Sequence, residues 1–404
     1  MIATGHALAT EAGVEVFRDG GNAVDAAVAA ALTLGMVDGN NSGLGGGCLI
    51  LIRSSDGRIT AIDGREMAPA AATKDMFVRD GVAITGASQT GPLAVGVPGA
   101  LAAYQLAIER SGTMQLARLL EPGIEQAASG FAIRRGLASA IAGTATDLAK
   151  FSGSKEIFLH PDGSPRKEGE QLVQADLAHT YRQIAEQGPD WFYRGPFAQA
   201  VGDWMAAHGG ILTAADFAAY QAKLRQPLET TYRGHKIIGF PPPSSGGVHV
   251  AQVLNMLESF DMRAIDERDP VEAAHILAEA FKLAFADRAY WLGDSDFVNV
   301  PRGLIAKDYT KELAARIDPA QTKDVQMHGT PAHWRQDVFG RHTTHIAAAD
   351  AAGNWVAITA TINTAFGSKV GLGNAGGLLV SGVIVSSLQS RLRWFGNTPN
   401  AARN

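Results

Sequence analysis

The stretch Gly340-Arg341-His342-Thr343-Thr344-His345 lies where a long, mainly helical pattern gives way to a short β pattern. If the chain is cut before Thr343, this residue carries a hydroxyl nucleophile and a free α-amine, which supply the nucleophile and base for acyl transfer. The pKa of an α-amine is about 7.7–8.0, against about 10.4 for lysine, so a useful fraction of the amine is neutral at neutral pH. The stretch therefore indicates either a threonine nucleophile exposed by cleavage or, more simply, a β-branched strand start.

The residues that follow predict a β-hairpin. Two β-prone runs, 344–349 and 355–361, flank a turn-type cluster at 350–354. This cluster contains a glycine that can adopt a positive φ, as hairpin turns often require.

The register of this hairpin predicts two polar side chains beside Thr343. A reversal centred on Ala352 pairs position 343 with position 361. Because side chains alternate along a strand, Thr361 and Asn363 then share the face on which Thr343 emerges. The candidate nucleophile would have a hydroxyl and an amide as neighbours.

The composition is typical of a folded protein that acts on a small molecule. The 404 residues are enough for a large core, and length alone suggests two or three domains. Lys and Arg number 35 against 40 Asp and Glu, a net charge of −5 without a basic stripe, so nothing favours nucleic acid or a charged membrane surface. The eleven histidines include no pair at metal-ligand spacing with a carboxylate, and we expect neither a metal nor another cofactor.

The single cysteine and the N-terminus bear on the compartment. Cys48 excludes an internal disulfide framework and lies in a glycine-to-apolar transition typical of a buried strand. The first six residues lack the pattern of a signal peptide, and no run of about 18 uncharged apolar residues follows. We therefore expect a cytoplasmic protein for the sequence as it stands, and a periplasmic or secreted one if an upstream signal has been removed.

The N-terminal part predicts two helices and a hairpin. Residues 8–19 have the periodicity of an amphipathic helix, and Asn22 is expected to cap a second helix. Asp25, within that helix, is expected to be a satisfied buried carboxylate rather than a catalytic one. Strands at about 48–53 and 58–63 should then form a hairpin.

Arg65 follows this hairpin and has two interpretations. Its planar fork suits a substrate carboxylate held by two hydrogen bonds, or an internal ion pair with Glu66, and the residues alone leave both open. The glycines within 43–47 fit neither pattern of a phosphate-binding loop and predict close backbone packing instead.

The central part of the chain is predicted to be mainly helical. We expect a strand at 229–240, a capping box at 213–216 and a helix at 271–291. Prolines 241–243 supply no backbone donors, so the segment leading into Ser244-Ser245-Gly246-Gly247 must form a turn or an edge. An oxyanion pocket at this serine pair beside two glycines stays open as an alternative. Residues 321–342 are polar and aperiodic, which is typical of an exposed, cleavable linker.

Taken in order, these motifs resemble those of the γ-glutamyltransferase (glutathione hydrolase) family of N-terminal-nucleophile hydrolases. The resemblance extends from about residue 3 to about residue 379. Besides Thr343-Thr344-His345, it rests on segments 20–27, 42–47, 63–69, 241–247, 286–288, 292–294, 350–354 and 361–368.

The resemblance implies a fold and a subunit organisation. The fold would be α/β (α+β), a four-layer αββα sandwich in which two β-sheets face each other between helices. Residues 1–342 would be the large-subunit region of a proenzyme and residues 343–404 the small-subunit region, and both would belong to one structural unit.

The resemblance also implies a reaction. The chain would cut itself between His342 and Thr343, and the Thr343 hydroxyl would take the γ-glutamyl group of glutathione or another γ-glutamyl amide as an ester. Water or an amino-acid acceptor would release the group. Thr361 would hydrogen-bond the nucleophile, Asn363 would receive the substrate's α-amino group, and Arg65 its α-carboxylate.

The sequence departs from the family pattern near Leu379. Ser386-Ser387 and Gly376-Gly377 match the family's substrate-binding and oxyanion-binding pairs by letter but not by context, so these roles are not transferred. We expect a truncated small-subunit region and an incomplete second sheet. Two alternatives stay open, an amidase of the same fold that acts on another acyl amide, as a cephalosporin acylase does, and a catalytically impaired truncated proenzyme.

Overall fold

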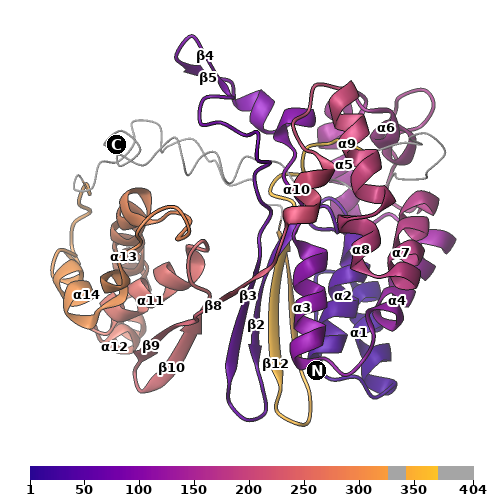
Figure 1. Ribbon diagram of the computed structural model, residues 1–404. Helices are drawn as coiled ribbons and strands as arrows, with labels where there is room; N and C mark the ends of the chain where they lie inside the picture. Colours follow the sequence, from indigo (N-terminus) through magenta and orange to yellow (C-terminus); the bar gives the residue numbers. More distant parts are fainter. Residues whose placement is uncertain (326–342, 372–404) are drawn as a thin grey trace. The chain divides into compact units, whose positions relative to one another are not determined.

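The computed structural model describes residues 1–325 and 343–371, without the side chains of Thr85 and Thr343. The described residues 1–224 and 343–371 form one compact unit, and residues 225–325 form a second (Figure 1). Residues on both sides of the predicted cleavage point therefore belong to the first unit. The division into large-subunit and small-subunit regions stays a prediction.

A six-stranded sheet organises the first unit. Its strands lie in the order β1-β11-β12-β2-β3-β8, and the pairs from β1 to β3 are antiparallel. The hairpin predicted from the sequence is confirmed, because Thr343 lies opposite Thr361 in the ladder between β11 and β12. The bounds are β1 Ile2–Ala3, β2 Gly47–Arg53, β3 Ile59–Gly64, β8 Lys223–Arg225, β11 Thr343–Ala349 and β12 Trp355–Thr361.

The two faces of this sheet differ in burial. Ile346 on β11, Ile358 on β12 and Ile50 on β2 are fully buried on the face that packs against helices. On the opposite face, His345 and Trp355 are exposed. The alternation has a period of two, as expected for a strand with one buried face.

Helices α1 (Ala7–Arg18), α2 (Ala23–Val37) and α3 (Ala100–Ser111) cover the buried face (Figure 1). The first two confirm the predicted helices, and Asn22 caps α2 by accepting the backbone N–H groups of Val24 and Asp25. Nearly every residue of α2 is buried, which agrees with its alanine-rich sequence: small side chains allow close packing on several sides.

Asp25 has the structural role predicted for it. Its side chain is fully buried and accepts backbone N–H groups from Asn22, Thr113 and Met114 at 2.9–3.2 Å, together with the Thr113 hydroxyl at 2.6 Å. The carboxylate therefore joins the start of α2 to the loop before α4 (Leu116–Ser129).

Further helices complete the first unit. They are α5 Arg135–Leu148, α6 Ser152–Phe158, α7 Ala175–Gln187, α8 Pro189–Tyr193, α9 Pro196–Ala207 and α10 Ala214–Ala219. Thr213 and Asp216 form the predicted capping box at the start of α10. A short hairpin pairs β4 Val78–Arg79 with β5 Val82–Ala83. A separate two-stranded antiparallel pair joins β6 Phe131–Ala132 to β7 Gln171–Leu172, which follows α5 and α6 in the chain.

The second unit combines a β-hairpin with helices. The segment 229–240, predicted as one strand, is instead two paired strands, because Arg233 and Gly234 take φ values of 48° and 82° and reverse the chain. The predicted helix at 271–291 is confirmed as α13. The elements are β9 Leu228–Tyr232, β10 His235–Gly239, α11 Gly246–Leu257, α12 Met262–Arg268, α13 Pro270–Trp291 and α14 Lys307–Ala314.

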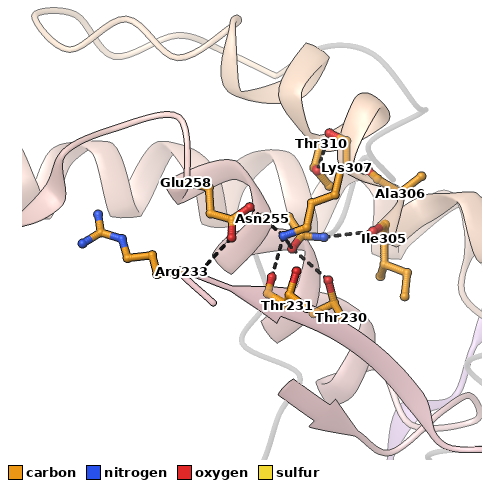
Figure 2. A network of polar contacts seen from close by, with 9 residues as sticks. All are labelled: Thr230, Thr231, Arg233, Asn255, Glu258, Ile305, Ala306, Lys307 and Thr310. Carbon is orange, nitrogen blue, oxygen red and sulfur yellow. Dashed lines mark hydrogen bonds and ion pairs between the residues drawn. The ribbon is translucent and has the colours of Figure 1, made fainter. Parts of the chain in front are cut away.

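An exposed lysine joins three elements of the second unit (Figure 2). The Lys307 ammonium, at the start of α14, donates to the Thr231 carbonyl on β9 and to the Asn255 and Glu258 side chains at the C-terminal end of α11. This contact holds the pKa of Glu258 below its usual value. All three donors of the ammonium are used within the unit.

None of the helices within residues 1–325 and 343–371 is both long and apolar enough to cross a bilayer.

The contacts of Asp25 predict a large loss of stability for a nearly isosteric substitution. Asp25→Asn should lower the free energy of unfolding by about 2–4 kcal/mol, because an amide NH₂ would face N–H donors that now bind a carboxylate. Urea unfolding followed by circular dichroism measures it. The control is Asp56→Asn, at an exposed carboxylate paired with Arg58, and this change should leave the stability close to that of the wild type. Equal losses in the two variants would contradict the structural role of Asp25.

Candidate active site

The hairpin of β11 and β12 brings the two predicted catalytic threonines to one end of the sheet. Thr343 begins β11 and pairs with Thr361, the last residue of β12. The Thr361 side chain is buried, and its Oγ1 accepts the backbone N–H of Asn363 at 3.0 Å. His342, and with it the predicted cleavage bond, lies outside the described residues.

Asn363 follows β12 in a left-handed backbone conformation, with φ of 70°. Asparagine tolerates this region better than most residues, and the conformation turns the chain sharply away from the sheet. Its side chain lies between two others: Oδ1 accepts from Arg65 Nη2 at 3.4 Å, and Nδ2 donates to Glu66 Oε1.

Arg65 is held by its backbone and by its side chain. Its N–H donates to Asp63 Oδ1 at 3.0 Å, and its carbonyl accepts the Tyr220 hydroxyl at 2.7 Å. Arg65 Nη2 also lies 3.4 Å from Glu66 Oε1, so the internal ion pair considered from the sequence is present. The Arg65 side chain as a whole is 22% exposed, and its Nη2 also contacts Asn363.

Glu66 is the residue that sequence reasoning did not place in the site. It is 1% exposed and contacts both predicted substrate-binding residues, Arg65 and Asn363. The only sequence signal for Glu66 was its position directly after Arg65. In the sequence analysis it was considered as an ion-pair partner of Arg65, in place of a substrate carboxylate. The structure instead joins the three side chains in one cluster of a cation, an acid and an amide.

The glycine-rich segment before β2 packs closely behind this cluster, as predicted. A methyl group at Gly47 would overlap the Glu66 carboxylate, and one at Gly46 would overlap the Thr361 carbonyl. Only glycine fits at these two positions, because the backbone here packs directly against the site and leaves no room for a side chain.

A turn after α2 holds both strands of the hairpin. The Asn41 carbonyl accepts the N–H of Ile362 at 3.2 Å, between Thr361 and Asn363. On the other strand, the Thr344 hydroxyl hydrogen-bonds the Asp38 carboxylate, which also accepts from Asn41 Nδ2 at 2.8 Å. Burial raises the pKa of Asp38 to about 6, although these two hydrogen bonds oppose the shift.

The environment of Cys48 does not support a thiol nucleophile. Burial raises the pKa of the Cys48 thiol well above its usual range, which disfavours the thiolate that a nucleophile would need. Among the described residues, no three His, Cys, Asp or Glu side chains gather as a metal site would require. The Gly376-Gly377 and Ser386-Ser387 pairs lie outside the described residues, and Ser244-Ser245 belongs to the second unit.

Comparison with known proteins identifies the family. The family model described as gamma-glutamyltranspeptidase matches residues 9–382. The chain belongs to the gamma-glutamyltranspeptidase family.

The known proteins that the chain matches include a glutathione hydrolase, a gamma-glutamyltranspeptidase and an acylase. The glutathione hydrolase proenzyme of Escherichia coli (strain K12) is 43% identical over 384 residues, which are 94% of this chain and 65% of that protein. The structure of the gamma-glutamyltranspeptidase of Helicobacter pylori matches with a TM-score of 0.77 and 39% identity, over 80% of this chain and 92% of that one. The cephalosporin acylase of Bacillus halodurans matches with a TM-score of 0.81 and 27% identity, over 99% of this chain and 70% of that one.

These matches confirm the predicted α+β fold class of this gamma-glutamyltranspeptidase family member. The chain spans slightly less than two thirds of the length of the E. coli relative. Within the described residues, the first unit contains one large antiparallel sheet covered by helices on one face. The roles predicted for Thr343, Thr361, Arg65 and Asn363 stay predictions.

The raised pKa of Asp38 predicts a pH-dependent stability difference. The folded protein holds the proton of Asp38 up to about pH 6, whereas the unfolded chain releases it near pH 3.8. Wild-type stability should therefore fall, relative to Asp38→Asn, as pH rises from about 4 to about 6, by on the order of 2–3 kcal/mol, and the difference should be constant above pH 7. Urea unfolding of both proteins between pH 4 and pH 8 measures it. A difference that does not vary with pH would show that Asp38 titrates normally.

Proposed function

We propose that this protein transfers or hydrolyses γ-glutamyl groups through an ester on Thr343, after self-cleavage between His342 and Thr343. The observation that carries the proposal is the cluster of Arg65, Glu66 and Asn363. This cluster is connected to Thr361, because the backbone N–H of Asn363 donates to Thr361 Oγ1. A γ-glutamyl group carries a carboxylate and an ammonium on one carbon. A guanidinium fork complements the carboxylate, and an acid with an amide oxygen complements the ammonium.

The proposed chemistry uses two groups of Thr343, its α-amine and its side-chain hydroxyl. Its α-amine, once freed, takes the hydroxyl proton while Oγ attacks the γ-carbonyl carbon of the substrate. The leaving amine departs with a proton, and an ester remains on Oγ until water or an acceptor amine attacks it. Thr361, paired with Thr343 in the ladder, is the proposed hydrogen-bond partner of the nucleophile.

The proposed subunits would stay together after cleavage. The strands β11 and β12 follow the cut, and they lie between β1 and β2, which precede it. Ladder hydrogen bonds on both sides of the hairpin would hold the small-subunit region in the sheet.

An acylase activity on another acyl amide is the second candidate, favoured by the likeness to the cephalosporin acylase of Bacillus halodurans. A glutaryl group differs from a γ-glutamyl group only by the missing α-ammonium, so a matched pair of anilides separates the two. Our proposal expects a higher kcat/KM for γ-glutamyl-4-nitroanilide than for glutaryl-4-nitroanilide. The reverse order would favour the acylase.

Self-cleavage depends on the Thr343 hydroxyl in this proposal. Thr343→Ala should stay a single chain, whereas Thr343→Ser, which keeps a hydroxyl, should still be cut, because attack on the adjacent carbonyl is intramolecular. Intact mass spectrometry of the purified proteins distinguishes one chain from two. If Thr343→Ala is cut at the same bond, an external protease is responsible.

Arg65→Lys should weaken γ-glutamyl substrates although the charge is kept. A lysine ammonium replaces a bidentate fork, and we expect a loss of about 1.5–3 kcal/mol in kcat/KM, or about 10–150-fold. Steady-state kinetics with the γ-glutamyl anilide measure it. Arg58→Lys, at an exposed arginine paired with Asp56, is the matched control and should have no effect. Wild-type kinetics in Arg65→Lys would remove Arg65 from the site.

A further inference from the structure

The segment 363–369, which begins with Asn363, has an unusual backbone. Four of its seven residues have positive φ values: Asn363 at 70°, Phe366 at 56°, Gly367 at 52° and Lys369 at 62°. Only one of these is glycine. Such conformations are unfavourable for residues with a side chain and persist where the surroundings enforce them.

The Lys369 side chain supplies much of this constraint. It is 5% exposed, and its ammonium donates to Gly367 O at 2.9 Å, Thr364 Oγ1 at 3.0 Å and Gln89 O at 3.2 Å. The Thr364 hydroxyl donates in turn to Gly367 O at 2.7 Å. All three donors of the ammonium are used, two of them within the segment itself.

The backbone of the segment is fixed by the rest of the first unit as well. Ser154 on α6 donates its hydroxyl to the Lys369 carbonyl at 2.7 Å, and the Gly91 N–H donates to the Ser368 carbonyl at 2.9 Å. Lys369 therefore connects the segment to Gln89 through its side chain, while its own carbonyl is held by Ser154 on α6.

An ammonium is a costly group to bury against uncharged acceptors. Burial lowers the pKa of Lys369 to about 8, with Asp147 the one charge that opposes the shift, so the ammonium form still dominates at neutral pH. A methionine would fill the same space without this penalty. The presence of lysine at a strained position thus points to a requirement for its three hydrogen bonds.

We propose that Lys369 is a positioning residue, which holds segment 363–369 in the one conformation that presents the Asn363 side chain to the substrate. Thr364, one of its three acceptors, directly follows Asn363 and donates its N–H to Ile362 O at 3.0 Å. The amide of Asn363 thereby stays between Arg65 and Glu66. This role rests on the proposed γ-glutamyl activity.

Two variants test, independently of activity, whether Lys369 holds segment 363–369 in one conformation. Lys369→Met removes the ammonium but keeps the strained backbone, and Lys369→Gly removes the ammonium and relieves the strain, so it should fold even if the first does not. Hydrogen exchange of peptides within 361–371 should become at least tenfold faster in both, whereas Lys150→Met, at an exposed lysine, should leave it unchanged. Unchanged exchange in both Lys369 variants would overturn the proposal.

Kinetics test the connection to Asn363. We expect KM for γ-glutamyl-4-nitroanilide to rise about tenfold in the Lys369 variants, with kcat changed less than threefold, because binding is what Asn363 would provide. In an Asn363→Ala background, Lys369→Met should change KM less than twofold, since both act on one contact. If the effects of Lys369→Met and Asn363→Ala on KM are additive, the positioning role is wrong. It is also wrong if the wild type turns over the substrate and the Lys369 variants have an unchanged KM. Either result would leave the proposed function intact. A wild-type protein without turnover would instead count against the proposed function, and hydrogen exchange would still decide whether Lys369 braces the segment.

Discussion

The ladder between β11 and β12 is the constraint on which the candidate site depends. It sets Thr343 opposite Thr361, and the flanking pairs with β1 and β2 fix the hairpin in the interior of the sheet. A slip of one residue would turn Ile346 and Ile358 away from the helices and expose them to water. Hydrophobic burial on one face therefore fixes the position of polar residues on the other.

The polar cluster beyond the hairpin is fixed by electrostatics instead. Glu66 is buried, and a buried carboxylate requires partners in good geometry. Arg65 and Asn363 provide them, and the absence of a side chain at Gly47 leaves the space that the carboxylate occupies. A cluster that is already ordered before a ligand arrives loses little side-chain entropy on binding.

The likeness to both a gamma-glutamyltranspeptidase and a cephalosporin acylase shows what the fold does and does not decide. Both solved structures match this chain along most of its length, so the architecture is common to two named activities. The distinction must come from the side chains that meet the acyl group. In this chain the relevant feature is the pairing of a guanidinium with an acid and an amide, which suits an acyl group that carries both charges.

The sequence by itself determined the local features. The hairpin register followed from a turn cluster of fixed length, the cap at Asn22 from side-chain chemistry, and the burial of Cys48 from the apolar run around it, because each depends on residues a few positions apart. The strand predicted at 229–240 was wrong where a left-handed Arg233-Gly234 pair reversed the chain.

Only the tertiary structure decided which residues meet across long separations. Glu66 and Asn363 are 297 positions apart, and Lys369 and Gln89 are 280 apart. Such contacts follow from how helices and strands pack in three dimensions, and no local periodicity encodes them.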